Sequence, residues 1–226
     1  MKIVCIGRNY IEHVNELNNE IPDEPVIFIK PDTALLRNNN PFFIPDFSND
    51  IHYEVEVVVK INKSGRHIPL EFAKDYYNEV SLGIDFTARD IQSVLKTKGL
   101  PWEKAKGFDH SAAIGIFIPL DTLLKQVSQI KNIDPKSQEA KSKESKIGIQ
   151  NIPFSLKKNT QLVQSGNTSQ MIHGIDTIIS YVSQYFGLRI GDYIFTGTPA
   201  GVGPVKKNDT LQGFLAGIEM FNFDIR

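Results

Sequence analysis

The chain has almost no cysteine, since Cys5 is the only one among its 226 residues. A single cysteine excludes an intramolecular disulfide and fits a reducing compartment. Long apolar runs are absent as well. The run nearest the N-terminus, residues 3–6, is too short for a signal peptide, and no run is long enough to span a membrane. These absences predict a soluble cytoplasmic protein without a membrane partner.

An excess of charge of one sign is also missing. The chain carries 25 basic and 26 acidic residues, whereas a dedicated nucleic-acid-binding protein usually shows a basic excess. We therefore expect no nucleic-acid partner. The hydrophobic share of 41% and the charged share of 23% are those of an ordinary globular protein. The length allows one large domain or two small ones.

What the sequence does contain is a series of short strand patterns. Apolar stretches bounded by turn-forming residues predict strands at residues 1–6, 26–30, 52–61, 80–86, 113–118 and 193–196, a strand pair or one long strand over 214–225, and a hairpin over 156–164. Helical spacing predicts helices at residues 10–17, 70–77, 91–98 and 170–186. Asn9 is the predicted N-cap of the first helix, and Gly187 ends the last. Many strands with a few short helices predict an α+β, mostly β fold.

One segment differs from the rest of the chain. Residues 123–158 carry eight lysines, and residues 132–145 within them have the composition of a flexible loop. Strand signals resume at Ile147. We therefore interpret residues 132–145 as a Lys-rich insertion into a single domain of residues 1–226.

Two glutamates lie in the strongest strand pattern. Glu54 and Glu56 share one face, opposite a row of valines, because side chains alternate along a strand. Two carboxylates are costly to bury without partners, so they must face water, a cation or a metal. Asp85 ends another predicted strand and adds a third carboxylate. Three oxygen donors without a cysteine favour Mg²⁺ or Mn²⁺ over Zn²⁺. The alternative is a solvated strand face with a capping aspartate.

Three further motifs could carry chemistry. His13 and Glu16 are neighbours at helical spacing, and a carboxylate beside an imidazole makes it a better general base. Lys106, among small and aromatic residues, could supply a fixed positive charge. The simpler alternatives are an incidental ion pair on an exposed helix and a surface lysine. Residues 197–203 are rich in glycine but match neither a P-loop nor a dinucleotide fingerprint, which leaves a turn that approaches another group closely.

In their order along the chain, these segments resemble the fumarylacetoacetate hydrolase family, with the small acylpyruvate hydrolase and oxaloacetate decarboxylase branch the most similar. The motifs that carry the resemblance are Gly7-Arg8-Asn9-Tyr10 with His13, Pro25-Val26-Ile27-Phe28-Ile29-Lys30-Pro31, His52-Tyr53-Glu54-Val55-Glu56, Asp85-Phe86-Thr87-Ala88-Arg89-Asp90, Gly99-Leu100-Pro101-Trp102, Lys106, Gly166-Asn167-Thr168-Ser169 and Gly197-Thr198-Pro199-Ala200-Gly201-Val202-Gly203. Each motif alone is weak, but the ordered set spans residues 3–213 and is specific.

The resemblance implies a mixed β-sandwich roll with short peripheral helices, which forms a homodimer and binds one Mg²⁺ or Mn²⁺ per subunit. The metal ligands it implies are Glu54, Glu56 and Asp85. The catalytic residues it implies are His13 and Glu16, a water-activating pair on a lid over the substrate, and Lys106. The substrate contacts it implies are Lys30, Arg89, Gln92 and Thr198.

The implied reaction is hydrolysis of a carbon–carbon bond in an acylpyruvate-type 2,4-dioxo acid, which releases pyruvate through a metal-stabilised enolate. The same machinery suits an oxaloacetate decarboxylase, or an isomerase or decarboxylase of a 2-hydroxymuconate-type catabolic intermediate. His13 and Glu16 favour hydrolysis, because the other reactions need no attacking water. Residues 107–113 depart from the family pattern, which leaves the 2-oxo acid substrate open. A non-catalytic binding protein of the same fold is the remaining alternative.

Overall fold

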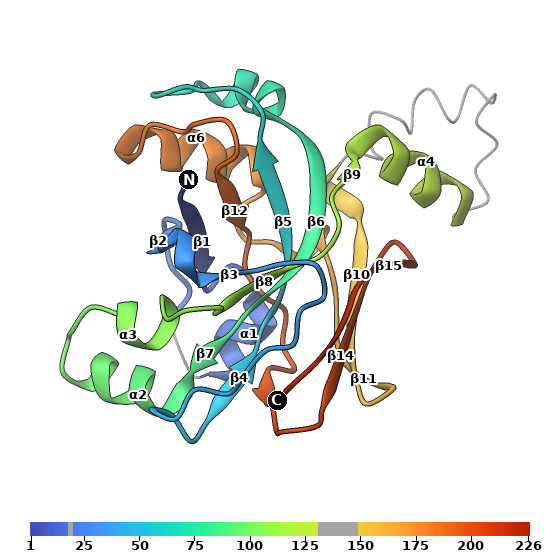
Figure 1. Cartoon of the computed structure of the whole chain (residues 1–226). Helices are drawn as coiled ribbons and strands as arrows, with labels where there is room; N and C mark the ends of the chain where they lie inside the picture. The colour runs from blue at the N-terminus through green and yellow to red at the C-terminus, as the bar shows by residue number, and fades with distance from the viewer. Residues whose placement is uncertain (18–19, 131–148) are drawn as a thin grey trace.

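Three sheets form the framework of the molecule in this computed structural model, which describes residues 1–17, 20–130 and 149–226. The largest sheet has the strand order β2-β1-β12-β5-β6-β8-β3, with β9 paired to β6 (Figure 1). Its strands are β1 (Ile3–Gly7), β2 (Val26–Lys30), β3 (Leu35–Leu36), β5 (Val55–Ile61), β6 (Tyr77–Asp85), β8 (Ala112–Ile114), β9 (Ile118–Pro119) and β12 (Tyr193–Phe195).

Two smaller sheets complete the β structure. The four-stranded sheet has the order β11-β10-β14-β15 and stands beside β5 and β6 in Figure 1. Its strands are β10 (Pro153–Lys158), β11 (Gln161–Asn167), β14 (Thr210–Leu215) and β15 (Ile218–Asp224). The short third sheet comprises β13 (Gly203–Pro204), β4 (Ile51–Tyr53) and β7 (Thr87–Ala88). The predicted mostly β roll is confirmed by this arrangement.

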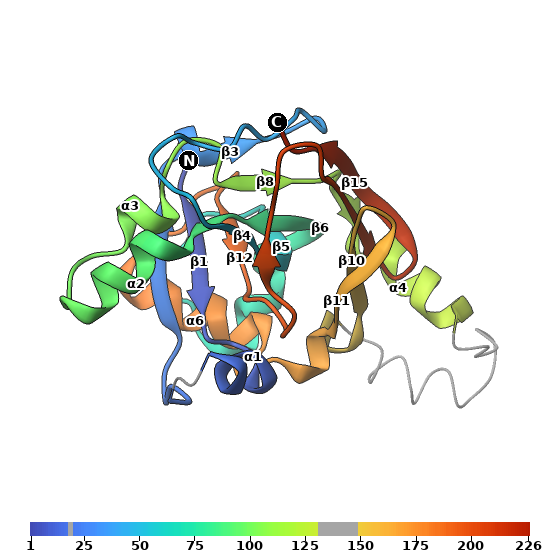
Figure 2. The ribbon, with the colours of Figure 1, turned by 90° about the horizontal axis from the view of Figure 1, so that it is seen from below.

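The helices lie around the outside of the sheets, as Figure 2 shows. The α-helices are α1 (Ile11–Glu16), α2 (Arg89–Thr97), α3 (Glu103–Lys106), α4 (Leu120–Ile130) and α6 (Ile175–Tyr185). The 3₁₀ helices are η1 (Asp32–Ala34), η2 (Leu70–Tyr76), η3 (Ile149–Asn151) and η4 (Thr168–Gln170). Among the described residues, no helix is long and apolar enough to cross a membrane.

The central sheet joins segments that are far apart in the sequence. Strand β1 runs parallel to β12, with Ile3 opposite Tyr193, and antiparallel to β2. Strand β12 is in turn antiparallel to β5. The first strand of the chain, the strand before the glycine-rich loop and the glutamate-bearing strand therefore lie side by side.

Strand β5 has two buried faces, and this decides where its charged residues must go. Val55, Val57 and Val59 are fully buried in the main core. Val58 packs on the opposite side in a second cluster, with Cys5 and Phe195. The predicted alternation is confirmed, but the face that carries Glu56 is also buried. A carboxylate there cannot be stabilised by bulk water and needs partners within the protein.

Several predicted elements differ in detail. The strand predicted over residues 52–61 is divided into β4 and β5 at Glu54, and the one over 113–118 into β8 and β9. The predicted helix at 70–77 is the 3₁₀ helix η2. Asn9 is not an N-cap, because Tyr10 occupies that position and the Asn9 side chain bonds to distant backbone instead. The predicted insertion, residues 132–145, lies outside the described residues.

Candidate metal centre and pocket

Three buried carboxylates meet at the end of the β5–β6 pair where β5 begins and β6 ends. Glu54 links β4 to β5, Glu56 lies within β5, and Asp85 ends β6. One oxygen from each lies within 4.8 Å of the others. The antiparallel register explains this proximity, because Val55 pairs with Ile84 and the amide of Asp85 donates to the carbonyl of Glu54 at 2.9 Å. The structure thus brings together the three predicted metal ligands.

Lys106 lies among these carboxylates. Its ammonium donates to Glu54 Oε2 at 2.8 Å, to Asp85 Oδ2 at 2.7 Å and to the hydroxyl of Thr87 at 2.6 Å. Burial would lower the pKa of Lys106, but the charges of Asp85 and Glu54 outweigh it and raise that pKa above its ordinary value. Burial would likewise raise the pKa of Glu54, yet Lys106 and then Arg89 hold it well below the ordinary range. Lys106 and Glu54 are therefore both charged at neutral pH.

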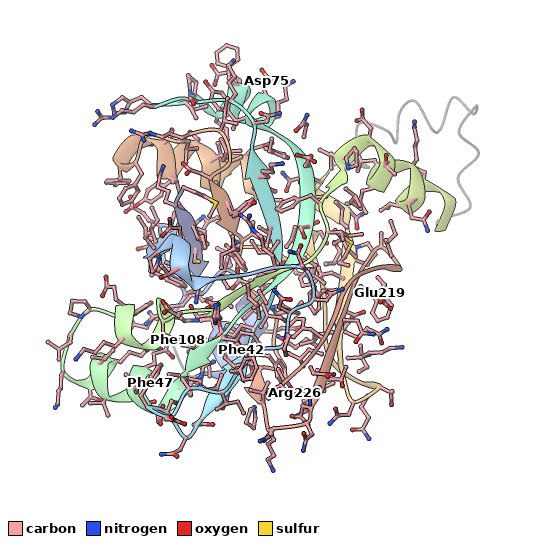
Figure 3. The ribbon with its side chains drawn as sticks, viewed as in Figure 1. Phe42, Phe47, Asp75, Phe108, Glu219 and Arg226 are labelled. Atoms are coloured by element: carbon pink, nitrogen blue, oxygen red, sulfur yellow. The ribbon has the colours of Figure 1, made fainter. Side chains whose placement is uncertain are left out.

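The short helix that carries Lys106 is held at both ends. The amides of Ala105 and Lys106 donate to the carbonyl of Trp102, which closes the only turn of α3. Just beyond the helix, the Phe108 ring packs edge-on against Phe47 with centroids 5.4 Å apart (Figure 3). Lys106 itself is 4% exposed, and the hydrogen bonds of its ammonium to Glu54, Asp85 and Thr87 keep it in place.

Glu56 lacks the cationic partner that its neighbours have. Its Oε2 accepts a hydrogen bond from the amide of Gly197 at 2.7 Å, and no lysine or arginine among the described residues forms an ion pair with it. Burial raises the pKa of Glu56 well above its ordinary value, and the Asp85 and Glu54 carboxylates raise it further. A divalent cation would supply the missing positive charge. The all-oxygen donor set suits a hard ion such as Mg²⁺ or Mn²⁺.

Lys30 lies behind the carboxylates and does not line the pocket. Its ammonium is 2.7 Å from Asp85 Oδ1 and donates to the hydroxyl and carbonyl of Ser111 at 3.0 and 3.1 Å. It also donates to the carbonyls of Phe86 and Lys106. The side chain is fully buried. The structure therefore does not place Lys30 where the predicted substrate contact requires it, because its buried ammonium lies outside the cavity lining and contacts only protein groups, Asp85 among them.

His13 and Glu16 form the predicted pair on α1. His13 Nδ1 lies 3.0 Å from Glu16 Oε2, and Glu16 Oε1 accepts from the amide of Gly201 at 2.9 Å. The second bond ties α1 to the glycine-rich loop. If Nδ1 carries the proton that Glu16 accepts, His13 keeps Nε2 free to take a proton. His13 is 6% exposed and lines the same pocket as the three carboxylates.

The glycine-rich loop needs its glycines. Gly197 has φ +98°, and a Cβ there would lie 2.7 Å from the Cβ of Asn9. Gly201 has φ +97°, and a Cβ there would clash with the carbonyl of Val163. Both angles belong to the region that glycine tolerates and other residues avoid. The loop is therefore close to other backbone, as the sequence predicts, and presents its amides to Glu56 and Glu16.

Gln164 is a residue that sequence reasoning missed. It is 1% exposed, accepts from the amide of Val55 at 2.9 Å, and donates to the Thr198 hydroxyl and the Pro199 carbonyl at 2.9 Å each. It thereby fixes the strand between the two glutamates relative to the glycine-rich loop. No local pattern indicates this role, because 109 residues separate Gln164 from Val55.

All the predicted site residues except Glu16 and Lys30 line one small cavity of about 40 Å³. Those lining it are His13, Glu54, Glu56, Asp85, Arg89, Gln92, Lys106 and Thr198. Arg89 donates to Glu54 Oε1 at 2.6 Å and to Gln92 Oε1 at 2.7 Å. The lining residues that sequence reasoning did not select as site residues include Arg8, Phe28, Lys96 and Trp102. The cavity therefore contains more positive charge than the prediction supplied.

A second, larger groove adjoins this cavity. It has a volume of about 400 Å³ and is lined mainly by apolar residues of β2 and of the segment before α3. Phe28, Trp102 and Lys106 line both spaces. The site thus combines a polar cavity with carboxylates and an adjacent groove suited to an apolar group.

Comparison with known proteins places these features in context. The family model described as fumarylacetoacetate (FAA) hydrolase, C-terminal, matches residues 2–222. A mitochondrial oxaloacetate tautomerase of Bos taurus is 40% identical over 99% of this chain and 90% of its own. A mitochondrial oxaloacetate decarboxylase of Dictyostelium discoideum is 41% identical over 99% of this chain and 93% of its own.

A solved structure extends the comparison to a bound ligand. The fumarylpyruvate hydrolase of Pseudomonas aeruginosa, in complex with Mn²⁺ and pyruvate, superposes with a TM-score of 0.83 at 30% identity. The match covers 100% of this chain and 89% of that one. This similarity covers the segments that carry the carboxylates, α1 and the glycine-rich loop.

Proposed function

The chain belongs to the fumarylacetoacetate hydrolase family, and from that premise we propose that it catalyses metal-dependent keto–enol chemistry on a 2-oxo acid of the oxaloacetate type. The reaction is tautomerisation, in which a C3–H bond breaks and the keto oxygen gains a proton. Decarboxylation of the same substrate breaks the C3–C4 bond instead, releases CO₂ and leaves the electron pair in the enolate of pyruvate, so both reactions place negative charge on the keto oxygen. The observation that carries the proposal is the buried carboxylate cluster with Lys106 at its centre.

Glu54, Glu56 and Asp85 would hold a Mg²⁺ or Mn²⁺ ion. Bound there, the ion would act as a Lewis acid toward the carboxylate and keto oxygens of a 2-oxo acid. The protein supports this choice, because the buried Glu56 carboxyl has no cationic partner among the described residues and the donor set is entirely oxygen. The Gly197 amide keeps Glu56 oriented toward the other two carboxylates.

Lys106 supplies a buried positive charge beside the reacting end of the substrate. Negative charge develops on the keto oxygen as the enolate forms, and a preorganised cation in a dry cavity stabilises it more than water would. Arg89, Gln92 and Thr198 line the same cavity and would orient the substrate carboxylate and keto group. Gln164 fixes the hydroxyl of Thr198 for this purpose.

The His13–Glu16 pair provides the base. Glu16 accepts the Nδ1 proton of His13, which leaves Nε2 to take the proton from C3 and to return it. The bond from the Gly201 amide to Glu16 holds α1 over the cavity and limits the access of water. A proton can then shuttle between carbon and oxygen without loss to solvent.

Hydrolysis of an acylpyruvate is the second candidate function. His13 and Glu16 could equally activate a water molecule, and the groove of about 400 Å³ could accept an acyl group next to Lys106. The Pseudomonas aeruginosa relative is named a fumarylpyruvate hydrolase. The sequence alone favoured hydrolysis. We now place oxaloacetate chemistry first, because two relatives of about 40% identity are named for oxaloacetate.

A substrate panel tests the proposal. The purified protein is given oxaloacetate, an acylpyruvate and a 2-hydroxymuconate-type dioic acid, with Mg²⁺, with Mn²⁺ or with EDTA. We expect the protein to accelerate the loss of the oxaloacetate enol absorbance when either ion is present. With EDTA the rate should equal that of the control without protein. Glu56→Gln should abolish both ion binding and turnover. Turnover of acylpyruvates alone, or any turnover by Glu56→Gln in EDTA, would refute it.

The assembly and cell location remain predictions. We propose a homodimer, which light scattering on the purified protein would test directly. The cytoplasmic location predicted from the sequence is tested by fractionation, and the two relatives above carry the word mitochondrial in their names. A binding protein without activity would fail the substrate panel but still bind oxalate with Mg²⁺.

A further inference from the structure

The cavity contains four cationic side chains and three carboxylates. Lys106 and Arg89 each form ion pairs with these carboxylates. Arg8 and Lys96 line the same cavity and form no ion pair with any described residue. With a divalent ion at the carboxylates, the lining would carry an excess of three positive charges. A single substrate carboxylate would leave most of that excess uncompensated.

Arg8 is held in an unusual backbone conformation at this position. It follows β1 with φ +58°, a left-handed angle that residues other than glycine rarely adopt. Its Nε is buried and has no hydrogen-bond partner in the structure. Backbone outliers with unsatisfied donors concentrate at sites that bind a ligand. The loop thus places at the cavity a guanidinium with one buried donor that no protein group satisfies.

Lys96 reaches the cavity from α2. Its ammonium lies 5.7 Å from the centroid of the Trp102 ring, which lines the cavity with it. Burial lowers the pKa of Lys96, and the charges of Arg8 and Arg89 lower it further. Arg8 and Lys96 line the same small cavity, so two positive charges face one space there. Two positive charges that line a partly buried cavity create a positive potential, which favours the binding of an anion.

We infer that Arg8 and Lys96 bind the second carboxylate of a dicarboxylic 2-oxo acid, while the carboxylate cluster and Lys106 hold the 2-oxo acid end. This inference rests on the proposed function and adds the residues that select the substrate. A monocarboxylic 2-oxo acid would leave Arg8 and Lys96 without a partner. The pair therefore determines specificity for dicarboxylates and takes no part in the proton transfer.

The decisive measurement is binding of two probes by calorimetry in the presence of Mg²⁺. Oxamate has the 2-oxo acid end alone, and N-oxalylglycine has the same end plus a distal carboxylate. We expect N-oxalylglycine to bind the unmodified protein at least tenfold more tightly. Lys96→Met should weaken the binding of N-oxalylglycine about tenfold, as expected for the loss of one charge-assisted hydrogen bond. The same variant should change the affinity for oxamate by less than twofold.

Three variants make the result specific. Lys96→Arg should keep the preference for N-oxalylglycine, because it keeps the charge. Lys98→Met, an exposed lysine at the end of the same helix, is the matched control and should change neither probe. Arg8→Gln should reduce the preference as Lys96→Met does. Thermal unfolding of each variant shows whether it folds, and oxamate binding shows whether the 2-oxo acid end is intact.

The outcomes separate this inference from the proposed function. Equal weakening of both probes by Lys96→Met, or no weakening of either, would overturn the dicarboxylate site. If the unmodified protein distinguishes the probes as expected but does not turn over oxaloacetate, the site stands and the proposed reaction fails. If it turns over oxaloacetate without distinguishing the probes, the reaction stands and the site fails.

Discussion

The two ends of the β5–β6 strand pair hold ion pairs of the same length in opposite surroundings. At one end, Lys60 and Glu79 are cross-strand partners 2.8 Å apart, and each side chain is 35% exposed. At the other end, Lys106 lies 2.8 Å from Glu54, and their side chains are 5% and 7% exposed. Distance alone does not distinguish the two pairs. The access of water does.

This difference in burial decides how much stability the protein loses when one charge of an ion pair is removed. Exposed pairs contribute about 0–1 kcal/mol, because water solvates both partners when the pair breaks. Removing one partner of a buried pair costs about 3–5 kcal/mol, because the other charge remains buried without compensation. At the inner end the buried Glu56 carboxylate also has no ion-pair partner among the described residues, and this makes it a candidate ligand for a divalent ion.

We expect the largest effect from Lys106→Met, which removes the buried ion pair at the inner end of the β5–β6 pair. It leaves Glu54 and Asp85 facing each other without their shared cation. We expect a loss of about 3–5 kcal/mol in the free energy of unfolding without metal. Mg²⁺ should restore part of this loss. Urea unfolding with EDTA and with Mg²⁺ measures both values, and a loss below 1 kcal/mol in EDTA would contradict the prediction.

The pH dependence of stability is the next test, because Glu56 has a raised pKa in the folded protein. Between the unfolded pKa of a glutamate, about 4.3, and the raised folded pKa, the folded state binds more protons than the unfolded state. The metal-free protein should therefore lose stability as pH rises through this window, with a slope of up to about 1.4 kcal/mol per pH unit from this group.

Thermal melting in EDTA from pH 4.5 to 8 checks this slope. Glu56→Gln is the reference, since it lacks the titrating group and should show a flatter profile. Mg²⁺ should remove the difference for the unmodified protein and release a proton on binding. If the melting temperature of the unmodified protein in EDTA rose with pH more steeply than that of Glu56→Gln, the raised pKa of Glu56 would be contradicted.

The hydrogen bond to Glu56 from the glycine-rich loop gives a smaller and more local effect. Gly197→Ala introduces a Cβ at 2.7 Å from Asn9 and shifts the amide that donates to Glu56. We expect a loss of about 2–3 kcal/mol and weaker Mg²⁺ binding. Gly191→Ala is the control, because Gly191 has φ +86° with open space around it. The Gly191→Ala variant should lose about 1 kcal/mol in the free energy of unfolding, the cost of a left-handed angle alone, and should bind Mg²⁺ as the unmodified protein does.

The smallest effect is expected at the outer end. Lys60→Met should change the free energy of unfolding by less than about 0.5 kcal/mol and leave metal binding unaltered. Urea unfolding at low and high salt measures the change. A loss similar to that of Lys106→Met would show that distance, and not burial, sets the contribution of these pairs.

The sequence predicted the parts of the site that follow from local rules. Alternation along β5 put both glutamates opposite the valines, and helical spacing joined His13 to Glu16. It could not show the burial of Lys30 or the position of Gln164, because their partners lie 55 or more residues away. Asn9 was wrong as an N-cap for the same reason. Its bonds to Thr196 and His173 replace the local one.

The parallel pairing of β1 with β12 sets a waiting time during synthesis. The two strands are about 190 residues apart, and Lys2 bonds to Asp192 across their ends. A ribosome needs about 10–40 s to add that length at 5–20 residues per second. Throughout that interval β1 can pair with β2 but has one open edge, which another nascent chain could join. Strand β1 therefore keeps an unpaired edge until β12, which lies in the last quarter of the chain, has been synthesised.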